Sequence, residues 1–343
     1  MALVRADDFQ FGFLLLSSSS VFQLGFGSGR TFFKFPNIAK PCSLAANLKA
    51  YLFMKHFLLF TVFVLTNIIA MSQSFDIVGH RKNIITLGYF ENNDIRLVGT
   101  GFLVETDGVF HLLTAKHVVT KKSLSGGLTN EFNDDNLYAF YYSKSGKIEN
   151  KKIKDIKLKY KLNWITHDST NVDIAMIPFD IDTAKDDLKV IPSSQFVDTK
   201  NLYETYEVYF VCYHPQLMNL NNLKPIFRTG NISRINDDKT ILLDAFAFPG
   251  NSGSPVFLKS SPTRYDKPGF NIGGDDLADK FIGIIGSYIP YDDIAVSVQT
   301  GQPRIIFQEN TGIAVIWSVD YLNQIINSDK NLKQISYIKK YFK

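Results

Sequence analysis

Short apolar runs rich in β-branched and aromatic residues recur along the chain from residue 83 onward, each bounded by Gly, Asn, Asp or Pro. Runs of this length at these intervals predict strands and an all-β sandwich or barrel. They occupy 83–90, 98–106, 109–115, 137–143, 172–179, 206–214, 225–235, 240–246, 254–258, 280–288 and 311–317. A helical spacing stands out at 319–326, where Leu322, Ile325 and Ile326 share one face.

A polar stretch at 183–203 separates two groups of runs and predicts an inter-domain linker. We therefore expect an N-terminal module over 73–190, a C-terminal module over 203–317, and a helix with a tail over 318–343. The 343 residues are 45% apolar, which supplies enough apolar surface for two cores and excludes a disordered chain.

The net charge of +4 is concentrated at the N-terminus. Residues 1–72 hold six basic and two acidic residues, which leaves 31 of each in 73–343. A protein held to nucleic acid by phosphate contacts is normally basic, so no nucleic-acid partner is expected. The two cysteines, Cys42 and Cys212, are too few for a disulfide scaffold or a cysteine-rich zinc site, and no metal or cofactor is expected. Cys212 lies in an apolar run and is expected to be an inert buried thiol.

Residues 54–72 have the pattern of a signal peptide: a short basic start, an apolar run of 14 residues, and small residues at positions −3 and −1 before Gln73. The run is shorter than the roughly 20 residues that span a bilayer. We expect an exported protein, periplasmic or secreted, without a stable membrane anchor after cleavage; a retained anchor is the alternative. Because a signal peptide opens a chain, we expect translation to begin at Met54 and residues 1–53 to be a wrongly assigned or disordered extension.

The lysine-rich stretch 147–162 could be a patch for heparin or nucleic acid. Apolar residues at 156, 158, 160 and 162 alternate with Lys157, Lys159 and Lys161. This alternation instead predicts a half-buried edge strand with a solvated lysine face.

Three segments carry residues that suit catalysis. GTGFLVETDGVFHLLTAKHVV (99–119) leads to His117, NVDIAMIPF (171–179) places Asp173 before an apolar strand, and FPGNSGSPVF (248–257) places Ser252 in a tight turn. A serine hydroxyl keeps its proton at neutral pH, so it needs an imidazole to accept that proton and a carboxylate to orient the imidazole. The three residues, 56 and 79 positions apart, suit a triad assembled from distant loops.

Glycines flank the candidate nucleophile. Gly250 and Gly253 permit backbone angles closed to other residues, so the N–H groups of Gly250 and Ser252 can turn toward one point. We expect these two amides to form an oxyanion hole.

Together these segments resemble the trypsin-like serine proteases of the chymotrypsin fold. TAKH is similar to the family's TAAH-type histidine motif, VDIAMI to its DIAL-type aspartate motif, and GNSGSP to its GDSGGP-type serine motif. The resemblance covers 78–326 and is closest to the bacterial HtrA-type and glutamyl endopeptidase branches. It implies two six-stranded antiparallel β-barrels with the active site between them, His117 and Asp173 in the first and Ser252 in the second, and a C-terminal helix.

Several other polar residues are expected to be structural: His80, His111, His167, Asp168, His214, Asp244 and Ser254. Ser254 is the main rival nucleophile, but the serine motif places the reactive serine directly after Asn251. An α/β-hydrolase elbow requires Gly-x-Ser-x-Gly, and Ser254 occupies the last glycine position, so that fold is disfavoured.

By position, the resemblance implies that Ile284, Ile285 and Gly286 pair with the substrate backbone and that Phe246 forms the base of the specificity pocket. An apolar Phe246 lacks the charge that would select Lys or Arg. Ile285 stands near the position where glutamyl endopeptidases carry a pocket histidine. We therefore expect a small or medium apolar residue before the scissile bond.

Two further departures from the family pattern concern activation and the cleft. Asn251 replaces the aspartate that, in digestive members, pairs with a freed N-terminal amine, so activity should not depend on an accurately cleaved N-terminus. The segments 260–279 and 289–310 are long polar insertions that we expect to rim the cleft.

The expected function is an exported serine endopeptidase that acts on proteins or peptides through an acyl-enzyme intermediate, without a cofactor. One alternative is a catalytically silent trypsin-fold module that binds peptides or partner proteins. Another is a hydrolase of small esters.

Overall fold

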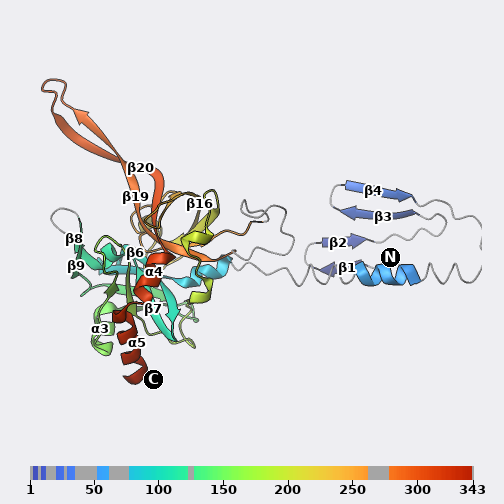
Figure 1. Cartoon of the computed structure of the whole chain (residues 1–343), viewed down its shortest axis with the longest axis horizontal. Helices are drawn as coiled ribbons and strands as arrows, with labels where there is room; N and C mark the ends of the chain where they lie inside the picture. The colour runs from blue at the N-terminus through green and yellow to red at the C-terminus, as the bar shows by residue number, and fades with distance from the viewer. Residues whose placement is uncertain are drawn as a thin grey trace, which may run out of the picture. The chain divides into compact units, whose positions relative to one another are not determined.

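The computed structural model describes residues 3–6, 9–12, 21–26, 29–34, 52–61, 77–122, 127–261 and 278–341. The chain divides between Met71 and Ser72 into two units (Figure 1).

The described residues of the first unit form two hairpins and a helix. β1 (Leu3–Ala6) pairs with β2 (Phe9–Gly12), and β3 (Val21–Phe26) pairs with β4 (Gly29–Lys34). The helix at 52–61 overlaps the predicted signal peptide, whose remainder lies outside the described residues. In the described part of the chain, every helix is too short or too polar to cross a bilayer. The signal peptide and a start at Met54 stay predictions.

Eight strands of the second unit's N-terminal half form one sheet, in the order β11-β10-β5-β6-β7-β13-β12, with β14 parallel to β6. Their bounds are β5 (Ile84–Glu91), β6 (Asp94–Thr106), β7 (Val109–Thr114), β10 (Tyr138–Tyr142), β11 (Ile148–Lys152), β12 (Ile165–Thr166), β13 (Ala175–Pro178) and β14 (Ile191–Pro192). A short helix, α2 (Lys116–Val119), leads into a separate pair, β8 (Thr120–Lys122) and β9 (Leu128–Phe132).

The C-terminal half is a closed barrel in the order β15-β16-β17-β20-β19-β18. Its strands are β15 (Glu207–Cys212), β16 (Ile226–Ile235), β17 (Thr240–Asp244), β18 (Pro255–Leu258), β19 (Phe281–Val296) and β20 (Pro303–Ser318). Short 3-10 turns are η1 (Ile77–Asn83), η2 (Ser193–Gln195), η3 (Thr199–Asn201) and η4 (Pro215–Leu217).

The predicted all-β architecture is confirmed, with one difference in the first half. The C-terminal half has the expected six strands in a closed barrel, whereas the N-terminal sheet has eight strands whose end members, β11 and β12, do not pair with each other. Two of the eight, β12 and β14, are only two residues long, and β14 comes from the segment 183–203 expected to be a linker. That segment therefore contributes a strand to the sheet through β6.

The register between β7 and β13 prepares the first half of the candidate site. Thr114 lies opposite Ala175 in this antiparallel pair. The chain therefore leaves β7 toward His117 at the same end of the sheet where it approaches β13 from Asp173.

The prediction for the lysine-rich stretch was wrong in its second half. Residues 153–160 form a helix, α3 (Ile153–Tyr160), and the strand β11 ends before it. Ile153, Ile156 and Tyr160 are buried, whereas Leu158 is 66% exposed. The buried residues follow the i, i+3, i+7 spacing of a helix, which coincides with alternation over so short a stretch.

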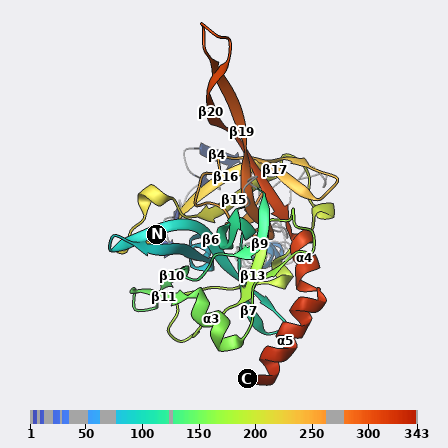
Figure 2. The same cartoon turned by 90° about the vertical axis from the view of Figure 1, so that its left-hand side faces the viewer.

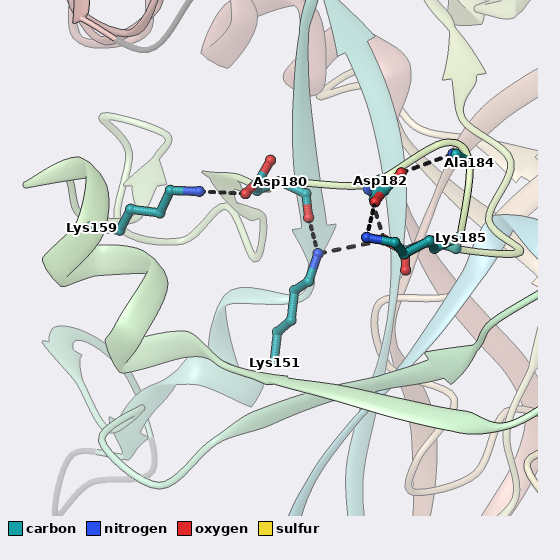
Figure 3. A network of polar contacts seen from close by, with 7 residues as sticks. Lys151, Lys159, Asp180, Asp182, Ala184 and Lys185 are labelled. Atoms are coloured by element: carbon teal, nitrogen blue, oxygen red, sulfur yellow. Dashed lines mark hydrogen bonds and ion pairs between the residues drawn. The ribbon is translucent and has the colours of Figure 1, made fainter.

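The lysines of this region pair with acidic residues of the loop after β13 (Figure 3). Lys159 Nζ lies 2.5 Å from Asp180 Oδ2, and Lys151 donates to the Asp180 carbonyl oxygen and to Asp186 Oδ2. Asp182 accepts from the Ala184 N–H in the same loop and pairs with Lys185. Lys151 and Lys159 are therefore held by partners within the fold.

Two helices end the chain. α4 (Val319–Ile326) has the bounds expected from the sequence, with Leu322 and Ile325 buried. A second helix, α5 (Asp329–Tyr341), follows it and was not expected. Figure 2 shows both helices on the same side of the second unit.

Candidate active site

His117 and Asp173 meet at the end of the N-terminal sheet. Asp173 Oδ2 lies 2.7 Å from His117 Nδ1, and Asp173 Oδ1 accepts the backbone N–H of His117 at 2.8 Å. Because the carboxylate can only accept, Nδ1 carries the proton in this pair. The Asp173 side chain is 9% exposed and that of His117 is 27% exposed. One buried carboxylate therefore holds both the ring and the backbone of His117, which leaves Nε2 as the nitrogen able to accept a proton.

Lys116 is a charged neighbour of this pair that the motif analysis did not single out. Its side chain is fully buried, and its ammonium donates to the Thr170 carbonyl oxygen at 3.2 Å. Burial lowers the pKa of Lys116, and the opposite charge of Asp173 works against that shift. The lysine thus ties the loop that carries Asp173 to helix α2.

Ser252 lies in the turn between β17 and β18. Gly250 and Gly253 both adopt positive φ angles, +93° and +85°, a conformation that favours glycine. The side chain of the fully buried Asn251 closes the turn from inside: its Nδ2 donates to the Tyr213 carbonyl oxygen at 2.8 Å, and its Oδ1 accepts the Phe248 N–H at 2.9 Å. Both partners belong to the barrel half, so the turn is held without an N-terminal amine.

The Ser252 turn is bound directly to the N-terminal sheet. Thr100 of β6 donates its N–H to the Ser252 carbonyl oxygen at 2.8 Å and its hydroxyl to the Gly250 carbonyl oxygen at 2.9 Å. A Cβ at Gly253 would lie 2.1 Å from the Thr100 carbonyl oxygen and 2.9 Å from the Ala115 nitrogen. Since Ala115 precedes His117 by two residues, the turn lies against the segment that carries the imidazole.

The hydroxyl of Ser252 does not hydrogen-bond to His117. Its Oγ donates to the Gly286 carbonyl oxygen at 3.3 Å, which is a long and therefore weak bond. In enzymes without substrate, catalytic hydrogen bonds are often long or misaligned and tighten when substrate binds. The structure therefore brings the three predicted residues into one region, with His117 and Asp173 bonded and Ser252 in another orientation.

The predicted oxyanion donors have no acceptor among the described residues. Within the turn, the Asn251, Gly253 and Ser254 N–H groups bond to backbone carbonyls. In the same part of the chain, the N–H groups of Gly250 and Ser252 donate to none. Two unpaired amides beside the nucleophile are the arrangement that stabilises a developing oxyanion.

The predicted substrate-binding edge needs a correction of register. Ile284 and Ile285 are both buried, Ile285 in the barrel core and Ile284 in the cluster that includes residues of the N-terminal half. Their backbones are already paired: Ile284 lies between Pro255 and Trp317, and Ile285 bonds to Gly253 and Ser254. Pairing with β18 ends there, so the edge of β19 next to the Ser252 turn opens only at Gly286. An added peptide would therefore pair from Gly286 onward, toward Tyr288.

Phe246, the predicted base of the specificity pocket, lies just after β17 and is 54% exposed. Its ring stacks on Phe248 with centroids 6.2 Å apart, and a Cβ at Gly312 would be 3.3 Å from it. Arg228 places its guanidinium 4.9 Å from the centroid of Phe248. The surface next to the Ser252 turn is therefore aromatic, with a cation behind it; the pocket role of Phe246 stays a prediction.

The other candidate residues have structural surroundings away from the His117 pair. His111 is fully buried, with Nδ1 3.2 Å from the Val109 carbonyl oxygen, and burial lowers its pKa to about 4. Ser254 is buried in the turn. The rest are held elsewhere: Asp168 by Lys330, His167 by Gln324, and His214 by the Gln216 N–H.

His80 packs against Phe257, and Asp244 lies at the exposed end of β17. Cys212 is buried as expected, and burial raises its pKa to about 12.

Residues 99–261 match the model of the trypsin-like peptidase domain. This part of the chain is similar to trypsin-like peptidases. The matched part of the peptidase domain contains His117, Asp173 and Ser252, and also the Thr100 and Gly253 contacts that join the two halves.

Solved structures were also compared with the chain. A serine endoprotease from Yersinia pestis is 16% identical with a TM-score of 0.38, over 75% of this chain and 64% of that one. A thermostable serine protease, AL20, from an extremophilic microorganism is 12% identical with a TM-score of 0.43, over 75% of this chain and 99% of that one. The chain thus spans less than two thirds of the Yersinia protein. No curated protein matches the chain by sequence.

Sequence reasoning missed the residues that join the two halves and the buried lysine. Thr100 lies in the GTG opening of the first segment, where a polar residue between two glycines was the available signal. Lys116 stands inside the TAKH motif itself, where a lysine directly before His117 was the available signal. Neither role can be read without the contact partners, which lie more than 50 residues away.

Proposed function

We propose that the chain is an exported serine endopeptidase that acts on proteins or peptides. The observation that carries the proposal is the His117–Asp173 pair, which is joined by two hydrogen bonds. The Ser252 turn packs against the segment just before the histidine. An orienting carboxylate, an imidazole with a free Nε2 and a serine beside two unpaired amides are the components of acyl transfer.

In the proposed mechanism, a bound peptide displaces the Ser252 hydroxyl from the Gly286 carbonyl oxygen and turns it toward Nε2 of His117. Oγ attacks the scissile carbonyl while Nε2 takes its proton, and the N–H groups of Gly250 and Ser252 stabilise the oxyanion. The imidazolium then protonates the leaving amine, which departs and leaves an acyl ester on Ser252. Water, deprotonated by His117, hydrolyses that ester and restores the hydroxyl.

Specificity and location belong to the same proposal. The apolar Phe246–Phe248 surface suits a small or medium apolar residue before the scissile bond. The segment 54–72 suits export to the periplasm or the medium. N-terminal sequencing of the exported protein should then give Gln73 as the first residue, and an intact N-terminus on a cell-bound protein would contradict export.

A fluorophosphonate probe tests the enzyme directly. We expect labelling of the wild type and none of Ser252→Ala, because the probe needs an activated serine. Turnover should fall by about 10⁶ in Ser252→Ala, as for removal of other triad serines. Ser254→Ala serves as the matched control and should still be labelled.

One observation favours a second candidate, a catalytically silent peptide-binding module: Ser252 Oγ bonds to Gly286 rather than to His117. That candidate predicts no labelling of either protein while peptides still bind. A third, a hydrolase of small esters, predicts labelling and ester turnover without cleavage of any member of a peptide library.

A further inference from the structure

Strands β19 and β20 continue beyond the barrel as a two-stranded arm, Tyr288–Asn310, which projects away from the rest of the unit (Figures 1 and 2). The sequence pattern predicted a polar insertion at the rim of the cleft for most of this segment. The structure instead shows regular antiparallel pairing from Pro290–Asn310 to Ala295–Ile305. The arm is therefore a regular β-hairpin and not an irregular loop.

The arm exposes large apolar side chains on both of its faces. Ile294 and Ile306 lie opposite each other and are 49% and 61% exposed. On the other face, Ile305 and Phe307 are 55% and 51% exposed, and Tyr291 is 59% exposed. An isolated two-stranded ribbon is marginally stable in water and gains stability from a third strand or a packed face. A partner that adds a strand or covers one face would therefore stabilise this arm.

The outer edge of β20 is the free edge best suited to another strand. In the barrel, β17 pairs with β20 only over 313–317. Among the described residues, no strand pairs with the outer edge of 303–309. Natural edge strands are usually blunted by charges, bulges or prolines. Here Pro303 and Arg304 begin the edge, and the apolar residues 305–307 follow them in a row without a charge.

We propose that two copies of the chain associate through this edge, with the arms forming a four-stranded antiparallel sheet about a two-fold axis at Ile306. Such an interface is isologous, so each residue must suit the position that symmetry assigns to it. Ile306 would face Ile306 of the second copy, and Ile305 would face its Phe307. Each Arg304 would face a Gln308, so no like charges meet.

Symmetry then continues the apolar pattern across the sheet. Because Ile294 lies opposite Ile306 within each arm, the pairing produces a row of four isoleucines on one face. The other edge of the arm is less suited to self-pairing. A two-fold axis on β19 at Asp292 or Asp293 sets an aspartate against itself. One at Ile294 gives the same row of isoleucines, but it sets Asp293 against Ala295 and Asp292 against Val296, so four carboxylates enter the strand pair with no cation opposite them. The β20 edge is therefore the self-complementary one, and β19 keeps its edge from Gly286 free for substrate.

Cysteine cross-linking tests the register in the full chain. Directly opposite residues of antiparallel strands have Cα atoms about 4.5–5.5 Å apart, within the range of a disulfide. Ile306→Cys should therefore form a covalent dimer under mild oxidation on non-reducing gels. Val298→Cys, at the fully exposed tip, is the matched control: at about 3.4 Å per residue its two copies would lie roughly 25 Å apart, and it should remain uncrosslinked.

Sedimentation velocity tests the association itself. The wild type should form a dimer, and Ile306→Arg should raise its dissociation constant at least about tenfold, with Val298→Arg unchanged. Thermal unfolding should match the wild type in both variants, because the arm lies outside the barrel core.

A monomeric wild type, equal cross-linking of the two cysteine variants, or unchanged association of Ile306→Arg would each overturn the proposal. So would a monomeric protein in which Ile306→Arg weakens only the cleavage of unfolded polypeptides, because the arm would then serve substrate binding. The test needs no peptidase activity, so its outcome is independent of the proposed function.

Discussion

The two halves of the candidate site differ in how far they are prepared. On the N-terminal sheet, His117 is held at two points by one buried carboxylate. On the C-terminal barrel, the Ser252 hydroxyl is held by one long bond, and the amides of Gly250 and Ser252 have no described acceptor. The His117 base is thus fixed before substrate binds. The Ser252 hydroxyl and the two amide donors can still form hydrogen bonds with the substrate and with His117. Preorganised donors that gain their partner only in the transition state contribute to rate rather than to ground-state binding.

The largest expected effect comes from disrupting the His117–Asp173 pair. Asp173→Asn should lower kcat by about 10⁴, because an amide in this place favours the wrong tautomer of His117. The asparagine Oδ1 can still accept the His117 N–H, so the fold should survive. Steady-state kinetics with thermal unfolding as the folding control checks this. A loss of less than tenfold would mean that Asp173 holds the chain without serving the imidazole.

The next effect concerns the oxyanion donors of the Ser252 turn. Gly250→Ala should lower kcat by about 10²–10³, the cost of removing one oxyanion donor. A Cβ there would lie 2.6 Å from Leu97 Cδ2 in a backbone with φ +93°, so the N–H must turn away. The matched control is Gly108→Ala, which has φ +75° but nothing within 4 Å of the added Cβ.

Both glycine variants should lose stability from the unfavourable φ. Only Gly250→Ala should lose turnover. Equal loss in the two would show that backbone strain, and not the oxyanion donor, explains the effect.

A smaller effect tests what shapes the Ser252 turn. Asn251→Asp keeps the side-chain shape but removes the donor to the Tyr213 carbonyl oxygen inside a fully buried site. Leaving buried groups unpaired typically costs about 1–3 kcal/mol of stability. Burial would raise the pKa of the new carboxyl in the folded state above its unfolded value. Its protonated form can donate, so the variant should be closest to the wild type below the unfolded pKa and lose stability as pH rises through the folded pKa.

Chemical denaturation of Asn251→Asp and the wild type at pH 3 and pH 7 measures this difference. If the difference in unfolding free energy were the same at both pH values, the charge of the new carboxyl would not affect the stability of the turn. A charged aspartate that stabilises the turn would point instead to a cationic partner, as in family members activated through an N-terminal amine.

Local motifs predicted the chemistry of the site better than its geometry. TAKH, VDIAMI and GNSGSP located the residues because each function requires particular side chains within a few positions. Helix α3 was missed because Ile156 and Tyr160 satisfy both a strand and a helix pattern over eight residues. The substrate edge was displaced to Ile284 because burial of β19 depends on β18, a partner that sequence does not show. The arm could not be predicted because its exposed apolar residues lie among polar ones.

The smallest expected effect concerns Lys116, whose buried ammonium donates to the Thr170 carbonyl oxygen in the loop that carries Asp173. Lys116→Met keeps an unbranched side chain of similar length but removes this donor, so the loop is held less firmly against helix α2. We expect kcat/KM to fall by about tenfold, the effect of losing about 1.4 kcal/mol, because Asp173 then orients His117 less precisely. Lys121→Met removes an exposed lysine paired with Glu131 and should leave kcat/KM unchanged. Equal kinetics of the two variants would show that the position of Asp173 does not depend on the bond from Lys116 to the Thr170 carbonyl oxygen.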